Sequence, residues 1–250
     1  MDSKIICVTG ATSGIGKSTA KIFAKNNWKV IATGRRQDRL TQLSSELGNN
    51  CLPLCFDVSD KKAVNEAFSS LPKEFQPIDV LINNAGAALG LDTSMDASIE
   101  DWETMVNSNI LGLLYCTKAV IKQMAERKKG TIVNIASIAA YTAYKGANVY
   151  GSTKAFVCQF SRNLRCDLHG SNVRVCNIEP GMLESEFSLV RFKGDAKRAD
   201  TVYADCQPLT PDDLADIIYF AVNTPQHVNI GRIQVMPTCQ SETGTIVYKS

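Results

Sequence analysis

The chain has 250 residues, of which 44% are hydrophobic and 21% are charged, values that fit a globular protein with one sizeable core. Its 27 Lys and Arg residues against 25 Asp and Glu residues leave a formal charge of +2. This balance excludes a strongly basic nucleic-acid-binding protein and an acidic disordered one. With no run of about 18 apolar residues and no signal-peptide pattern, we expect a cytoplasmic protein that binds neither membranes nor nucleic acids.

Nine cysteines are scattered along the chain without a Cys-x-x-Cys pair. An odd number without metal-ligand spacing indicates reduced thiols in a cytosolic protein. We therefore expect no disulfide and no metal site.

Short apolar runs alternate with longer amphipathic segments along the chain. The apolar runs predict strands at residues 4–8, 29–33, 52–56, 80–82, 131–135, 174–178 and 232–236. Helices are predicted between them at residues 16–26, 38–47, 60–70, 101–126, 149–168 and 210–222. Because the strands lack polar alternation, their sheet should be buried on both faces. The order predicts an α/β fold, a doubly wound parallel sheet with helices on both faces.

Residues 1–250 contain no linker that would divide this domain. The least regular stretch, residues 182–207, carries many charges and is predicted to be a mobile insertion that closes over substrate. The polar tail, residues 238–250, either reaches a neighbouring subunit or is frayed.

A glycine-rich turn joins the first strand to the first helix. Its spacing is Gly-x-x-x-Gly-x-Gly, and glycines allow a tight turn and a close approach of the backbone to a pyrophosphate. The following helix N-terminus offers N–H groups to the anion. A plain strand–helix connector is the alternative. The predicted cofactor contacts here are Gly10, Thr12, Ser13, Gly14, Ile15 and Gly16.

Two arginines, Arg35 and Arg36, follow the second strand, where NAD-binding proteins carry an acidic residue for the ribose hydroxyls. A guanidinium group can bind a 2′-phosphate with two hydrogen bonds. The pair therefore predicts NADP(H) over NAD(H). Solvated arginines at a helix start are the alternative interpretation.

Tyr150 and Lys154 are four residues apart and so lie on one helix face. An ammonium beside a phenol favours the phenolate and lowers its pKa, which makes tyrosine a plausible proton donor and acceptor for a carbonyl. Ser137 follows the strand at 131–135 and can donate a hydrogen bond to the same oxygen. Asn109 lies inside a predicted helix, where asparagine is unfavourable. Taken singly, each residue could equally be a satisfied polar group.

Together these motifs resemble the short-chain dehydrogenase/reductase superfamily. The resemblance rests on the glycine turn, Asn83-Asn84-Ala85-Gly86, Asn109, Ser137, Tyr150-(x)3-Lys154 and Pro180-Gly181, and implies a single-domain Rossmann fold with a seven-stranded parallel sheet. It implies these roles: Tyr150 as acid–base, Lys154 also holding the nicotinamide ribose, Ser137 orienting the carbonyl, and Asn109 sustaining a water relay. It also implies cofactor contacts at Asp57, Val58, Asn84, Ala85, Gly86, Pro180 and Gly181.

A narrower set of segments resembles the NADP-dependent 3-hydroxy acid dehydrogenases. It includes Ala32-Thr-Gly-Arg-Arg36, Asn148-Val-Tyr-Gly151 and Val190-Arg-Phe-Lys-Gly194. The resemblance implies substrates of the L-allo-threonine, L-serine and 3-hydroxypropionate or malonic semialdehyde type. The chain departs from related bacterial enzymes after Gly181, where it reads Met-Leu-Glu-Ser-Glu-Phe.

A 3-hydroxy acid needs a partner for its carboxylate, because a buried unpaired charge is costly. Arg191 is our first choice, since its planar group suits a carboxylate. Glu184 or Glu186 would receive an amino group if the substrate resembles serine. The alternative is that these are solvated charges on a mobile loop.

Two other functions fit the same motifs. One is another short-chain reductase, acting on 3-oxoacyl carriers or apolar ketones without a carboxylate clamp. The other is a catalytically silent NADP-binding regulatory protein. Apolar faces on the helices at 101–126 and 149–168 predict a homodimer or homotetramer, the usual assembly of the superfamily.

Overall fold

Seven strands form a single parallel sheet in the computed structural model, which describes residues 4–204 and 206–242. The strands are β1 (Ile5–Val8), β2 (Lys29–Gly34), β3 (Cys51–Cys55), β4 (Val80–Asn83), β5 (Gly130–Ile135), β6 (Val173–Pro180) and β7 (Arg232–Val235). Their order is β3-β2-β1-β4-β5-β6-β7 and every neighbouring pair is parallel. The predicted α/β Rossmann class is confirmed.

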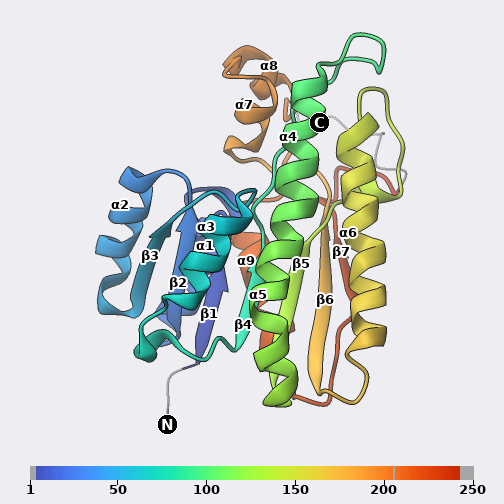
Figure 1. The fold of residues 1–250 in the computed structure, drawn as a ribbon. Helices are drawn as coiled ribbons and strands as arrows, with labels where there is room; N and C mark the ends of the chain where they lie inside the picture. The colour runs from blue at the N-terminus through green and yellow to red at the C-terminus, as the bar shows by residue number, and fades with distance from the viewer. Residues whose placement is uncertain (1–3, 205, 243–250) are drawn as a thin grey trace.

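Helices cover both faces of the sheet (Figure 1). One face packs against α1 (Gly14–Lys25), α2 (Gln37–Leu47) and α9 (Pro211–Asn223), and the other against α3 (Lys61–Ser69), α5 (Leu113–Glu126) and α6 (Asn148–Asp167). Short 3-10 turns are η1 (Gly48–Asn50), η2 (Lys73–Phe75) and η4 (Ile138–Ala140). Among the described residues, no helix is long and apolar enough to cross a membrane.

Strand β1 shows why the apolar runs lack polar alternation. Ile6 and Val8 pack into the core under α1 and α9, whereas Ile5 and Cys7 pack into the core under α3 and α5. Successive side chains of a strand point to opposite faces, so both sets must be apolar when both faces are covered. The two cores hold most of the buried aliphatic residues. Burying one large aliphatic side chain stabilises the folded state by about 1.5–3 kcal/mol.

The long helix predicted at 101–126 is not one regular α-helix. It begins earlier, as α4 (Ile99–Val106), and passes through a π-helical turn, η3 (Asn107–Gly112), before α5. Ser98 caps α4 by accepting a hydrogen bond from the Asp101 N–H. A π turn inserts one residue into the helix and is frequent at functional sites. Asn109 lies inside it.

The predicted irregular insertion at 182–207 is more regular than expected. It contains α7 (Glu186–Arg191) and α8 (Ala196–Thr201), whose first turns are capped by the side chains of Ser185 and Asp195. Both helices lie above the carboxyl edge of the sheet (Figure 1). Six-residue helices give too weak a periodicity to be recognised in a sequence, which explains the error.

The expectation of nine reduced thiols is wrong for two of them, because Cys206 and Cys239 form a disulfide. The chain after β7 turns back onto the insertion, where Gln240 Oε1 accepts a hydrogen bond of 2.7 Å from the Met182 N–H. This return brings together two cysteines that are 33 residues apart. The rest of the predicted tail, residues 243–250, lies outside the described residues.

Candidate active site

A cleft of about 450 Å³ opens at the carboxyl ends of the strands. The strand order reverses between β1 and β4, and ligands of open α/β sheets bind at such a point. The predicted residues that line the cleft are Gly10, Thr12, Ser13, Gly14, Ile15, Arg35, Arg36, Asp57, Val58, Asn84, Ala85, Gly86, Ser137, Tyr150, Lys154, Pro180 and Gly181. The structure thus brings together residues that are spread from 10 to 181.

The glycine turn requires glycine at two positions for different reasons. Gly10 has a φ of 67°, in the left-handed region, and a Cβ there would lie 2.9 Å from the Ala85 Cα. A Cβ on Gly16 would lie 2.4 Å from the Gly10 carbonyl oxygen, so helix α1 could not approach the turn. Asn84 fixes the turn from β4, donating to the Thr9 and Gly10 carbonyls at 2.9 and 3.1 Å. Gly16 therefore acts behind the cleft and does not line it.

The same turn is ready to bind an anion. Ser13 is the N-cap of α1 but makes no capping hydrogen bond within the described chain, which leaves the first N–H groups of the helix available. Arg36 donates to Thr12 Oγ1 and Ser13 Oγ, both at 2.8 Å from its Nη2. A guanidinium group beside a free helix N-terminus fits the phosphates of a dinucleotide.

Glu186 of α7 closes over this arginine from the insertion. Its carboxylate pairs with Arg36 at 3.0 Å and also with Arg39. Hydrogen bonds from Arg39 and Arg36 hold the pKa of Glu186 below its usual range. Glu186 is therefore engaged at the cofactor end of the cleft, and the structure does not favour it as a partner for a substrate amino group. Sequence reasoning missed Arg39, although it lies three residues after Arg36 on the same helix face.

The predicted catalytic residues meet at the other end of the cleft. Tyr150 is 8% exposed, and its ring packs against Phe187 with the centroids 5.8 Å apart. Lys154 is buried, and its Nζ donates to the Ile135 carbonyl at 2.8 Å. Ser137 accepts from the Ala139 N–H as the cap of η4, which fixes the hydroxyl beside the phenol.

The prediction that Lys154 lowers the pKa of Tyr150 is wrong. Burial raises the pKa of Tyr150 to about 12, while a hydrogen bond from Ser137 and the charge of Arg191 act to lower it. Lys154 is not among the groups that shift it, because its ammonium points to a carbonyl, 5.8 Å from the phenol ring centroid. The cation whose charge acts on the phenol is thus Arg191, more than forty residues away in sequence.

Burial also lowers the pKa of Lys154, from 10.5 to about 8. Between these pH values the unfolded chain binds more protons than the folded one, so the free energy of unfolding should rise with pH. Lys154→Met removes this contribution. The Tm of the wild type minus that of the variant should therefore increase from pH 7.5 to pH 10, measured by calorimetry without cofactor. Lys73→Met, at an exposed lysine, should show no such trend, and a flat difference for Lys154→Met would contradict the buried-ammonium assignment.

Asn109 does not line the cleft but connects two elements that do. Its side chain accepts from the Ala87 N–H at 2.8 Å and donates to the Ala87 carbonyl at 2.9 Å and to Thr153 Oγ1 at 3.0 Å. It therefore ties the segment after β4 to α6 beside Tyr150. The water relay stays a prediction. Thr153, which completes this connection, gave no sequence signal of its own.

The two predicted substrate residues lie in different places. The Arg191 guanidinium is 5.6 Å from the ring centroids of both Tyr144 and Tyr150, and it donates to Tyr144 Oη at 3.0 Å. Glu184 is exposed, and neither Glu184 nor Arg191 is among the residues that line the cleft. Tyr150 also belongs to a hydrophobic cluster, whose other members are Ala88, Leu89, Trp102, Met105, Ala139, Tyr144, Val149 and Phe187. Two cations, Arg191 and Lys154, thus lie 5.6 and 5.8 Å from the Tyr150 ring centroid, and Arg191 is the one that approaches from the insertion.

Comparisons with known proteins agree with this geometry. Residues 4–194 match the family described as short chain dehydrogenase. The chain is 51% identical to an NADP-dependent 3-hydroxy acid dehydrogenase YdfG of Salmonella typhi over 98% of this chain and 100% of that protein. It is 48% identical to a serine 3-dehydrogenase of Rhizobium radiobacter over 99% of both chains. The solved closed form of a serine dehydrogenase complexed with NADP+ is 49% identical, with a TM-score of 0.95, over 98% of this chain and 100% of that one.

Proposed function

Because this chain belongs to the short-chain dehydrogenase family, we propose that it transfers a hydride between NADP(H) and C3 of a short 3-hydroxy or 3-oxo acid. The proposed substrates are of the L-allo-threonine, L-serine and 3-hydroxypropionate or malonic semialdehyde type. The observation that carries this choice is the Arg191 guanidinium, 5.6 Å from the centroid of the Tyr150 ring, beside a cluster of apolar side chains. Two of its relatives carry corresponding names, as NADP-dependent 3-hydroxy acid and serine 3-dehydrogenases.

NADP(H) fits the residues of the cleft. The free N-terminus of α1 and the group of Thr12, Ser13 and Arg36 would hold its phosphates, with Arg35 at the 2′-phosphate. Asp57 and Val58 would contact the adenine, and Lys154 the nicotinamide ribose. When bound, the cofactor supplies or accepts the hydride.

Proton transfer falls to Tyr150 in this proposal. During reduction its phenol gives a proton to the carbonyl oxygen, and during oxidation it takes one from the hydroxyl. Ser137, fixed by η4, donates a second hydrogen bond to that oxygen. The raised pKa of Tyr150 keeps its phenol protonated at neutral pH, and Ser137 and Arg191 act to lower that pKa.

Arg191→Met tests the substrate class. We expect kcat/KM for L-serine and L-allo-threonine to fall at least about tenfold, because a hydrogen bond to a charged group contributes about 1.5–3 kcal/mol. The rate with an apolar ketone should change less than threefold. Initial rates from NADPH absorbance measure both, and Arg198→Met, in which a neighbouring arginine over Phe192 is lost, is the matched control.

Two results would overturn the assignment. An unchanged kcat/KM for the acids removes Arg191 from the substrate site. An equal loss for acids and ketone shows that Arg191 acts on the phenol of Tyr150 and not on a carboxylate. The rival function, a reductase of 3-oxoacyl carriers or apolar ketones, predicts turnover of those compounds alone.

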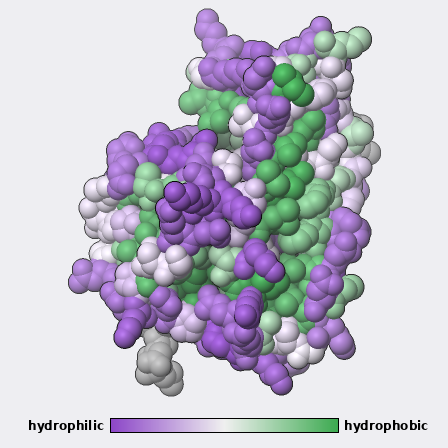
Figure 2. Space-filling view, in the orientation of Figure 1, coloured by the Kyte–Doolittle hydropathy of each residue, from purple (hydrophilic) through white to green (hydrophobic). Residues whose placement is uncertain are grey.

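We also propose that the protein is a cytoplasmic homo-oligomer, a dimer or tetramer. A band of apolar residues follows α5 on the face shown in Figure 2. On α6, Phe156 is 36% exposed and stacks on Phe160. A second copy of this chain would cover such a face. Sedimentation velocity measures the oligomeric state, and we expect the mass of two or four chains. A single species with the mass of one chain would contradict the proposal.

A further inference from the structure

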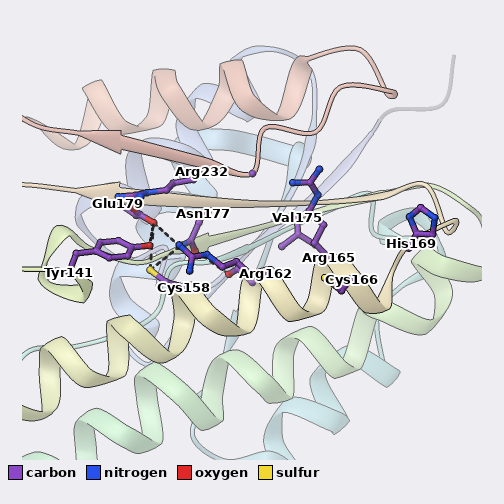
Figure 3. A pocket seen from close by; sticks show the side chains of 12 residues that line it. Tyr141, Cys158, Arg162, Arg165, Cys166, His169, Val175, Asn177, Glu179 and Arg232 are labelled. Atoms are coloured by element: carbon purple, nitrogen blue, oxygen red, sulfur yellow. Dashed lines mark hydrogen bonds and ion pairs between the residues drawn. The ribbon is translucent and has the colours of Figure 1, made fainter.

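A second cavity, of about 680 Å³, lies between α6 and the strands β6 and β7 (Figure 3). It shares no lining residue with the cofactor cleft. Its lining contains three guanidinium groups, those of Arg162, Arg165 and Arg232, and one carboxylate, that of Glu179. The proposed hydride transfer uses none of these four residues.

The carboxylate at the floor of this cavity is already satisfied. Glu179 is fully buried, and its Oε1 accepts hydrogen bonds of 3.1 Å from both Tyr141 Oη and Asn177 Nδ2. Its Oε2 pairs with Arg232. Arg232 also donates to Gln234 at 3.1 Å and lies over the Tyr141 ring, 4.3 Å from its centroid. Glu179 and Arg232 therefore neutralise each other and leave no acceptor for the remaining arginines.

Arg162 and Arg165 have no hydrogen bond or ion pair from their side chains within residues 4–204 and 206–242. They lie three residues apart on α6, and His169, two residues beyond the end of this helix, lines the same cavity. Arg165 reaches across to Gly231, the residue before β7, where an added Cβ would lie 3.1 Å from its Nη1. The missing side chain at Gly231 thus leaves the space that this guanidinium occupies.

We propose that this cavity is a binding site for a small phosphate monoester. The two unpaired guanidinium groups that line the cavity leave a balance of two positive charges, which matches a phosphate dianion. The cavity is larger than one phosphate, and Val175, Cys166 and His169 extend it toward the end of α6 (Figure 3). The remainder of the ester would lie there. Because the two cavities share no lining residues, the phosphate ester and NADP(H) would occupy separate sites.

Isothermal titration of the full-length protein, saturated with NADP+ and in phosphate-free buffer, tests the site. Saturation with cofactor blocks the anion site at the glycine turn. The probes are inorganic phosphate and glycerol 3-phosphate. We expect one phosphate site per chain, weakened at least tenfold in Arg162→Gln/Arg165→Gln. The control Lys25→Gln/Lys73→Gln, which removes two exposed charges elsewhere, should change the Kd less than twofold.

The two probes separate the possible sources of the phosphate group. If glycerol 3-phosphate binds more tightly than inorganic phosphate, the ligand is a monoester. If inorganic phosphate binds equally or more tightly, the monoester proposal is wrong and the ligand is the free anion. The proposal is overturned if the wild type binds neither probe, or if the arginine variant and the control bind equally. The wild type could bind no phosphate while the arginine variant sediments differently from it. That result would assign the two arginines to a subunit contact instead. Arg165→Gln alone, at an exposed position, keeps the test available if the double variant does not fold.

Discussion

Replacing Tyr150 with phenylalanine is expected to lower kcat at least a hundredfold, while NADPH still binds. The change removes one oxygen from a ring that packs against Phe187, so the packing is preserved. What is lost is the proton donor, and a positioned acid or base contributes about 10²–10⁴-fold to a rate. Initial rates with malonic semialdehyde and NADPH measure the loss, and NADPH fluorescence measures the affinity.

Tyr219→Phe is the matched control, because Tyr219 lies on α9, packs edge-on against Phe23 and does not line the cleft. It should leave kcat within about twofold. A Tyr150→Phe protein that retains its rate would remove Tyr150 from the chemistry. A wild-type protein that binds NADPH but turns over none of the acids, ketones or thioesters would instead favour the regulatory interpretation.

The sequence predicts the cleft because its parts are local. The Tyr150 and Lys154 spacing, the glycine turn and the two arginines after β2 are each contained in a few neighbouring residues. A parallel sheet places the carboxyl ends of its strands at one edge, so local motifs at strand ends must converge. The seven apolar runs specify that sheet, because side chains of both faces are buried, as β1 shows.

The contacts that were missed join residues distant in sequence. Glu186 pairs with Arg36 across 150 residues, and Arg191 reaches Tyr150 from a helix too short to be recognised. The Cys206–Cys239 pairing depends on the return of the chain after β7. Each of these three contacts forms because residues 182–207 fold over the carboxyl edge of the sheet. The spacing of neighbouring residues in the sequence does not predict that packing. The predicted effect of Lys154 on the pKa of Tyr150 is wrong for a related reason. The Lys154 ammonium donates its hydrogen bond to the Ile135 carbonyl of β5.

Exchanging Arg35 for aspartate should lower the preference for NADP+ over NAD+ about a hundredfold. Arg35 lies at the end of the cleft that the adenosine would occupy, beside Asp57, to which its Nη1 is 3.4 Å distant. The change removes a hydrogen bond to a charged phosphate, about 1.5–3 kcal/mol, and adds a repulsive carboxylate. The same carboxylate can accept hydrogen bonds from the ribose hydroxyls of NAD+. Ratios of kcat/KM and Kd values from fluorescence titration measure the preference.

Arg35→Ser separates the two contributions, because it removes the attraction without adding repulsion, and should lower the preference about tenfold. Lys73→Asp makes the same change of charge at an exposed site outside the cleft and should leave the preference unaltered. If Arg35→Asp behaves like this control, Arg35 does not contact the 2′-phosphate. The role would then pass to Arg36, which already binds the glycine turn, and to Arg39, which shares Glu186 with it. In that case the 2′-phosphate of NADP+ would displace the Glu186 carboxylate from Arg36 and Arg39, and this exchange would set the cofactor preference. Glu186→Gln would then change the preference, although Arg35→Asp does not.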